Sequence, residues 1–429
     1  MLSVLRHRTY RHLFAAQAIA LVGTGLATVA LSLLAFELAG QSAGLVLGTA
    51  LAIKMVAYVG IAPITTAMAQ RLPRRTVLVT LDLLRAAVAL SLPFVTQIWQ
   101  IYLLIFLLQS ASAAFTPTFQ ATIPDVLPDE QDYTKALSLS RLAYDLESLL
   151  SPMLAAALLG VMSFHALFGG TVLGFLASAL LVVSVALPSP ASAERRGFYD
   201  RTTRGLRIYL ATPRLRGLLA ISFAVAAAGA MVFVNTVVLV QAQWGLPQNA
   251  LALALASFGA GSMAAALGLP RLLDRWPDRP VMLGGVALLC GVMAAGMWVT
   301  SYAALLPLWC VAGIAYSVAQ TPSGRLLRRS AHPADRPALF AAQFALSHAC
   351  WLLFYPLAGW AGAHWGMRAT FAVLGVAVLL ALCVAWWVWP ADDPEVIEHD
   401  HDDGTHHAHA FWIDDQHPHW PAPRHRSSI

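Results

Sequence analysis

The chain has 429 residues, of which 58% are hydrophobic and 11% are charged, and its formal net charge is +5. Soluble domains carry about 25% charged residues, so this composition excludes an ordinary soluble protein and indicates a membrane protein. The positive charge lies mostly in short segments between apolar stretches, which does not favour a nucleic-acid partner. The four cysteines lie within apolar segments without metal-ligand or disulfide spacing, and we interpret them as small buried side chains.

The apolar segments predict twelve membrane-spanning helices, because a helix needs about 20 apolar residues to cross a bilayer. The first segment follows a basic N-terminus but is too long for a cleaved signal peptide. In chain order the predicted spans are 10–37, 42–68, 75–97, 100–122, 135–160, 164–187, 214–242, 248–272, 279–300, 302–326, 336–362 and 367–389.

Four landmarks recur along the chain at a nearly constant offset of 204 or 205 residues. The matching pairs are 9–11 with 214–216, 70–75 with 274–279, Thr116-Pro117 with Thr321-Pro322, and Ser151-Pro152 with Tyr355-Pro356. A doubled apolar half is typical of transporters whose substrate site lies between the repeats. The sequence therefore predicts an all-α membrane protein whose twelve transmembrane helices form two pseudo-symmetric six-helix bundles. The expected domains are an N-terminal bundle (1–187), a linker (188–213), a C-terminal bundle (214–390) and a tail (391–429).

The basic residues predict the orientation of these spans. Of the 27 Lys and Arg, 21 lie at the N-terminus or in the even-numbered connections, whereas the odd-numbered connections hold one, Arg368. Basic residues are enriched on the cytoplasmic side of membrane proteins. We therefore expect both termini and the linker to be cytoplasmic, in a bacterial-type inner (plasma) membrane.

The loop between the second and third spans, Ala67 to Arg75, resembles a signature of the major facilitator superfamily of secondary transporters. The family pattern is G-x-x-x-D-R/K-x-G-R-R/K, and this chain has Gln70 in place of the aspartate, whereas the second copy keeps an acid, Asp274. In the family, the loop acid pairs with basic residues across the two halves and holds one facing state. The resemblance therefore implies a gating role for a set of loop and adjacent residues: Arg71, Arg75, Asp82, Arg85, Asp274 and Arg275.

The stretch from Thr116-Pro117 to Ser151-Pro152 is similar to the siderophore and drug exporter branch of that superfamily. Those exporters carry a glycine-proline element in the fifth span, which is reduced here to Ser151-Pro152 followed by small residues. The resemblance implies export from the cytoplasm.

Four ionisable residues fall near the middle of predicted spans: Lys54, Asp145, Glu147 and His348. A charge at this depth costs a few kcal/mol, so each is a functional candidate. We expect them to carry coupling protons; the alternatives are a fixed buried ion pair and, for His348, a neutral hydrogen-bonded core residue. Asp145 and Glu147 are two residues apart, about 200° around a helix, so only one should face a central cavity. Arg141 is spaced for a structural i,i+4 pair with Asp145.

Uncharged polar residues mark the predicted substrate cavity. They lie on the four spans that line the cavity in the superfamily: Gln17, Gln109, Asn235, Tyr316 and Gln320. The alternative for each is a packing contact between helices, worth about 0.6 kcal/mol.

Eight of the fourteen histidines follow Glu398, interleaved with aspartates. Imidazole suits nickel, cobalt, zinc and copper, and the tail is similar to the His-rich cytoplasmic tails of nickel-resistance members of the superfamily. The predicted metal ligands are His399, His401, His406, His407 and His409. The alternative is a tail whose metal affinity is incidental.

Together these features predict a proton-coupled transporter that exports a small organic molecule by alternating access. The sequence has no G-x-x-x-x-G-K-S/T loop for ATP and no Ser–His–Asp set of a membrane hydrolase, so we expect no enzyme activity. The alternative is a nickel or cobalt exporter that uses the tail as an ion collector. We expect a monomer in the lipid bilayer whose partners are the substrate and protons, with no required cofactor.

Overall fold

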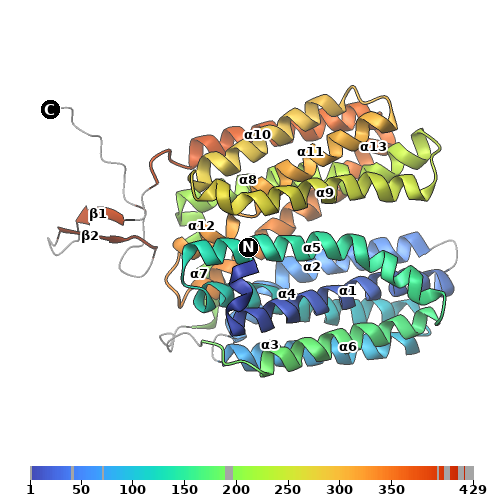
Figure 1. The fold of residues 1–429 in the computed structure, drawn as a ribbon, viewed down its shortest axis with the longest axis horizontal. Helices are drawn as coiled ribbons and strands as arrows, with labels where there is room; N and C mark the ends of the chain where they lie inside the picture. The colour runs from blue at the N-terminus through green and yellow to red at the C-terminus, as the bar shows by residue number, and fades with distance from the viewer. Residues whose placement is uncertain are drawn as a thin grey trace.

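The computed structural model describes residues 2–39, 43–69, 72–188, 197–393, 396–400, 406–413 and 420. Its first half is a bundle in which α1 packs on α5 and α6, and α4 packs on α2 and α3 (Figure 1). Two 3-10 segments, η1 (Leu2–Arg6) and η3 (Leu92–Phe94), precede α1 and follow α3. The six helices are α1 (Arg8–Ala39), α2 (Ala43–Ala69), α3 (Arg74–Ser91), α4 (Ile98–Val126), α5 (Glu130–Leu159) and α6 (Phe164–Val183).

The second half repeats this arrangement: α8 packs on α13, and α11 packs on α9 and α10. A π-helical segment, η4 (Val238–Gln243), extends α8. The helices are α8 (Pro213–Val237), α9 (Gln248–Leu273), α10 (Asp278–Gly296), α11 (Tyr302–Gln320), α12 (Ser323–Arg329) and α13 (Arg336–Val388).

Ten helices in the described residues are long and apolar enough to cross a membrane. Two features bring this number to the twelve predicted spans. The first is α5, which with 30 residues is long enough to cross a membrane but is not among the ten, and which carries six charged residues from Glu130 to Glu147. The other feature is α13, which contains two spans.

A single glycine divides α13 into these two spans. A continuous helix of 53 residues would be about 80 Å long, far more than the roughly 30 Å of a bilayer core. Gly366 has φ 76° and ψ 169°, a backbone conformation that is essentially restricted to glycine. The chain therefore turns at Gly366 and returns through the membrane, close to the predicted boundary between residues 362 and 367.

The linker contains a helix that its Arg-, Ser- and Pro-rich composition did not predict, α7 (Phe198–Ala211). Its buried face includes Ile208 and Tyr209 and packs on α13, while α7 also contacts α2 of the first half. Gly205 packs so closely on the Ala338 backbone that a Cβ there would overlap it. The helix therefore bridges the two halves.

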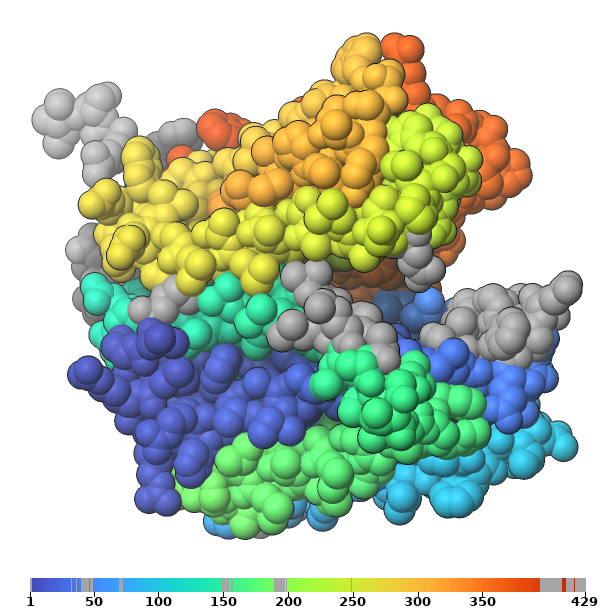
Figure 2. All heavy atoms as spheres, turned by 45° about the vertical axis from the view of Figure 1, so that its right-hand side comes forward, coloured from blue at the N-terminus to red at the C-terminus, as the bar shows by residue number. Residues whose placement is uncertain are grey.

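The α7 and α12 helices and the tail residues 396–400 and 406–410 lie at one end of the molecule, which we call the terminal end (left in Figure 1). At the opposite end the two halves part, and Figure 2 shows a hollow between them.

The tail begins with a two-stranded antiparallel hairpin, β1 (Val396–Asp400) and β2 (His406–Ala410). Directly after β2, Phe411 and Ile413 are buried in the core of the second half. Trp420 lies over the guanidinium of Arg214 at 4.8 Å and against Phe411. The tail is thus anchored on the terminal end of the second half.

Candidate transport cavity

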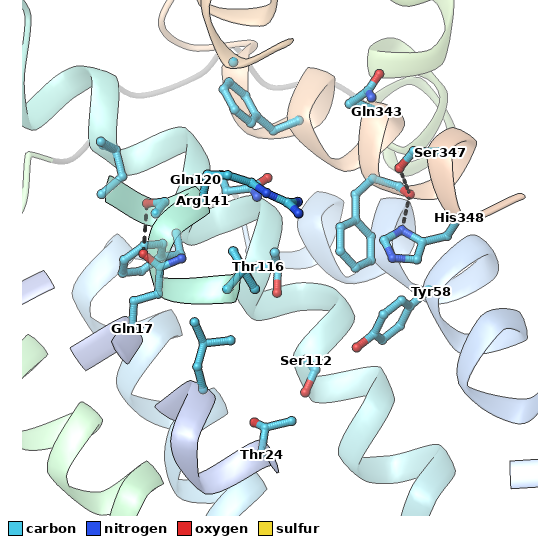
Figure 3. Close-up of a pocket in the computed structure, with 18 of the residues that line it drawn as sticks. Gln17, Thr24, Tyr58, Ser112, Thr116, Gln120, Arg141, Gln343, Ser347 and His348 are labelled. Carbon is cyan, nitrogen blue, oxygen red and sulfur yellow. Dashed lines mark hydrogen bonds between the residues drawn. The ribbon is translucent and has the colours of Figure 1, made fainter. Parts of the chain in front are cut away.

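A cavity of about 520 Å³ lies between the two halves. The first half contributes residues of α1, α2, α4 and α5, and the second half contributes residues of α11, α12 and α13. Its wall is mixed: amide, hydroxyl and charged side chains alternate with aromatic rings (Figure 3). Such a wall suits a solute with both polar and apolar surface.

Tyr58 of α2 is a central contact of this cavity (Figure 3). Its hydroxyl donates to Oε1 of Gln109 at 2.9 Å, and the ammonium of Lys54 lies 5.5 Å from its ring. His348 of α13 meets the same ring edge-on at 4.7 Å. Nδ1 of His348 lies 2.7 Å from the Phe344 carbonyl oxygen, a contact that requires a proton on Nδ1. Lys54 and His348 therefore both contact the ring of Tyr58, and the two halves meet at this ring.

Of the two acids in the middle of α5, Glu147 lines the cavity and Asp145 does not line it. Asp145 is buried and accepts two hydrogen bonds from Arg141, at 2.5 and 3.1 Å. Glu147 packs over Gly25 of α1, where a Cβ would lie 2.6 Å from its carboxylate oxygen. The helical geometry thus places one acid in an ion pair and the other at the cavity.

Two arginines also reach the cavity wall. Arg141 donates to Ser262 of α9 at 3.0 Å and lies 4.7 Å from the ring of Tyr316, so it joins the halves at mid-depth. Arg85 pairs with Asp82, which also accepts from Ser178 of α6 at 2.8 Å. The Asp82–Arg85 pair is buried and lies within the first half.

The predicted substrate residues have three different surroundings. Gln17, Gln109 and Gln320 line the cavity. Tyr316 lies beside the cavity, in contact with Arg141. The prediction for Asn235 is wrong: it is 1% exposed and donates to the Ala358 carbonyl at 3.1 Å, because it packs α8 against α13.

Sequence reasoning missed other polar residues of the wall. They include Tyr58, Thr116, Gln120, Gln343 and Ser347 (Figure 3). Helical spacing could have found them: Thr116 and Gln120 follow Gln109 by two and three turns of α4, so the three residues share one face. On α13, Gln343 and Ser347 are likewise one turn apart, and Ser347 directly precedes His348.

At the terminal end, an ion cluster closes the space between the halves. Asp125, at the end of α4, lies 2.5 Å from Arg74 of its own half and 2.5 Å from Arg336 of the second half. All three side chains are at most 15% exposed. The cluster therefore joins α4 to the start of α13 in a partly desolvated setting.

A second cluster of the same design lies beside it. Arg325 of α12 lies 3.0 Å from Asp278 of its own half and 2.5 Å from Glu130 of the first half. Arg74 and Asp278 begin α3 and α10 and are 204 residues apart, the repeat offset. These two members are thus related by the internal repeat and carry opposite charges.

The predicted gating residues lie around these clusters. Arg71 is outside the described residues, and Arg75, Asp274 and Arg275 are exposed. The neighbouring Arg74 and Asp278 make the buried contacts instead. The change of sign between the two copies of the loop was the sequence signal for them.

The histidine side chains predicted to bind metal, on His399, His406, His407 and His409, lie outside the described residues, as does the whole of His401. The backbone register of the hairpin pairs His399 with His407. Within the described part of the chain, no group of three His, Cys, Asp or Glu side chains is arranged to hold a metal ion. A metal site in the tail stays a prediction.

Two helical bundles around a shared cavity, closed at one end and parted at the other, are the architecture of an alternating-access transporter. The family model of the Major Facilitator Superfamily matches residues 13–234 and again residues 218–426. The chain belongs to this superfamily. It is a multi-pass membrane transporter and not an enzyme.

Solved structures of other transporters have the same fold. The human organic anion transporter MFSD10 (TETRAN) superposes with a TM-score of 0.78 at 14% identity, covering 88% of this chain and 99% of that one. A bacterial homologue of the iron transporter ferroportin in an outward-facing state superposes with a TM-score of 0.71 at 13% identity, covering 89% and 99%. At these identities the likeness shows the fold alone.

Sequence relatives in the superfamily include efflux proteins. Macrolide efflux protein A of Streptococcus pyogenes is 25% identical over 181 residues, 41% of this chain and 44% of that protein. Macrolide efflux protein A of Enterococcus faecalis is 26% identical over 136 residues, 30% and 42% of the two chains. The matches thus span less than half the length of these relatives.

Proposed function

We propose that this chain exports a bulky amphipathic organic molecule across a bacterial plasma membrane in exchange for protons. The observation that carries the proposal is the pair of opposite charges, Lys54 and Glu147, on the wall of one cavity between the halves. An ionisable group at membrane depth usually has a function. Here Lys54 and Glu147 line the cavity, which in alternating access opens to each side of the membrane in turn.

In the proposed cycle, Glu147 is the group that exchanges proton for substrate. Ionised Glu147 attracts the polar or cationic part of the substrate within the cavity. After the cavity opens to the other side, a proton binds Glu147, removes its charge and weakens this attraction, so the substrate leaves. The ring nitrogen Nε2 of His348 is the second proton acceptor, because Nδ1 already donates its proton to the Phe344 carbonyl.

The substrate class is supported by the cavity wall and by the relatives. A volume of about 520 Å³ lies within the range of about 300–1,000 Å³ typical of small-molecule sites. Five glutamines and several hydroxyl side chains offer hydrogen bonds to an oxygen-rich solute, and aromatic rings offer apolar contact. Macrolides, the substrates in the relatives' names, are solutes of this kind.

The direction of transport follows from the orientation predicted by the basic residues. With both termini in the cytoplasm, the ion clusters of Asp125 and Arg325 close the cytoplasmic side and the hollow of Figure 2 opens outward. This is the state from which an exported molecule is released. We propose that the monomer is the transporting unit, since the cavity is formed by one chain.

Proteoliposomes with an imposed pH gradient test this function. Radiolabelled erythromycin is the probe, and its flux is compared between the wild type, Glu147→Gln and Glu37→Gln. Glu37 is the control because it is a half-exposed carboxylate of α1, 4.0 Å from His165 and away from the cavity. We expect gradient-driven flux to fall at least ten-fold in Glu147→Gln and to persist in Glu37→Gln. Equal gradient-driven flux in all three proteins would refute the coupling role.

A further inference from the structure

Five aromatic side chains of the second half form a continuous strip. Phe258 contacts Tyr316 and Phe233, with ring centroids 5.5 and 5.4 Å apart. Phe233 in turn lies 6.0 Å from Trp351, and Trp351 lies 5.0 Å from Tyr355. The rings come from four helices, α8, α9, α11 and α13. Only Tyr316 among them was predicted from the sequence to belong to the substrate cavity.

The strip lies beside the cavity between the halves. Its inner end is fixed by Tyr316, whose ring lies 4.7 Å from the guanidinium of Arg141 in the first half. Further along, Phe233 is 47% exposed, although 78% of an 18-residue apolar stretch of its span is buried. This span, α8, lies centrally in its bundle and packs on α10, α11 and α13. Trp351 follows Ser347 by one turn of α13, and Tyr316 precedes Gln320 by one turn of α11, so these two rings share a helix face with residues of the cavity wall.

The internal repeat shows why the two walls differ. Lys54 and Phe258 occupy equivalent positions, 204 residues apart, and so do Glu147 and Trp351. The same offset relates the flanking landmarks at 70 and 274 and at 151 and 355. The first half therefore has a charge at two positions where the second half has an aromatic ring.

We propose that this strip is an apolar subsite that binds the unsaturated or aliphatic face of the exported molecule, while the charged wall of the first half binds its polar face. This inference rests on the proposed function and specifies its substrate as an amphiphile with two unlike faces. Aromatic rings offer a large contact area at little conformational cost, since they are already packed on one another. Phe233 provides the outer edge, and Trp351 and Tyr316 provide the floor between it and Arg141.

Trp351 is held in place by the backbone below it. A Cβ at Gly229 of α8 would overlap the indole ring. The outer edge of the indole therefore abuts α8, and its position does not depend on a bound solute. A subsite that is formed in advance loses little entropy on binding.

Equilibrium binding of radiolabelled erythromycin to the purified full-length protein tests the subsite. The variants are Phe233→Ala, which removes the exposed ring, and Trp351→Phe, which keeps an aromatic ring. The control is Trp360→Ala, which removes a 48% exposed indole from the same helix as Trp351 but outside the strip. We expect Kd to rise about ten-fold for Phe233→Ala, less than three-fold for Trp351→Phe, and not at all for Trp360→Ala.

The outcomes separate this inference from the proposed function. No binding of erythromycin to the wild type would overturn the proposed function and the subsite with it. Binding to the wild type with an unchanged Kd in Phe233→Ala would overturn the subsite alone. A rise in Kd for Phe233→Ala, with the pH dependence of erythromycin flux unchanged, supports the strip as a binding surface that takes no part in proton exchange.

Discussion

The Asp125–Arg336 ion pair should determine what fraction of the molecules has a closed terminal end. Nη1 of Arg336 lies 2.5 Å from Oδ1 of Asp125, and the two side chains are 15% and 14% exposed. A hydrogen bond between charged groups at this burial contributes about 1.5–3 kcal/mol, more than a fully solvated pair would. Because the contact exists only when the halves meet, Arg336→Gln destabilises the closed state relative to the open state by about 2 kcal/mol. The ratio of closed to open molecules then falls roughly 30-fold.

Spin labels on each half measure this ratio by electron paramagnetic resonance. Positions 75 and 275 are exposed, one in each half near the terminal end, and the labels are introduced in a cysteine-free background. We expect one short distance in the wild type and a second, longer distance in Arg336→Gln. The control is Asp132→Asn, which breaks a solvated pair with Lys135 inside the first half. An unchanged distance distribution in Arg336→Gln, or an equal shift in the control, would refute the reasoning.

Three further changes have defined outcomes. Gly25→Ala places a methyl group where it overlaps the Ser151 side chain and lies 2.6 Å from the Glu147 carboxylate, so we expect gradient-driven erythromycin flux to fall at least five-fold. Normal flux would show that α1 shifts to accommodate the methyl group without affecting Glu147. Gly366→Ala forces a side chain into a backbone region that costs about 1–3 kcal/mol and should lower Tm by several degrees in a thermal-shift assay. Gly284→Ala is its control, since a Cβ there meets open space, and an equal Tm in both variants would contradict the argument. Truncation after residue 393 should abolish binding of Ni²⁺ measured by titration calorimetry, if the tail histidines are the ligands; binding that persists would place the site elsewhere.

The spans were predictable because membrane helices follow a simple physical rule. Each must satisfy its own backbone hydrogen bonds and cover about 30 Å of hydrocarbon, so length and hydropathy locate it. The predicted spans 164–187 and 248–272 correspond to α6 (Phe164–Val183) and α9 (Gln248–Leu273). Hydropathy alone did not predict α7, because its stability comes from packing on α13 and α2 rather than from contact with lipid.

The cavity was predictable only in part. Glu147 and Lys54 stood out as charges at depth, and both line the cavity. Asn235 stood out equally as a polar residue, yet it binds the Ala358 carbonyl inside its bundle. The difference is the rotation of the helix about its axis, which the packing of α8 on α13 sets and the hydropathy of the span does not record.

By itself, the amino-acid sequence determined that this protein is inserted in a bilayer and that it consists of two repeats. It also determined which ionisable residues lie within the membrane-spanning segments. The three-dimensional structure alone decided which charges meet. Arg74 and Arg336 both contact Asp125, although their helices begin more than 250 residues apart. Folding brings these charges together and removes most of the water around them, and this strengthens their attraction.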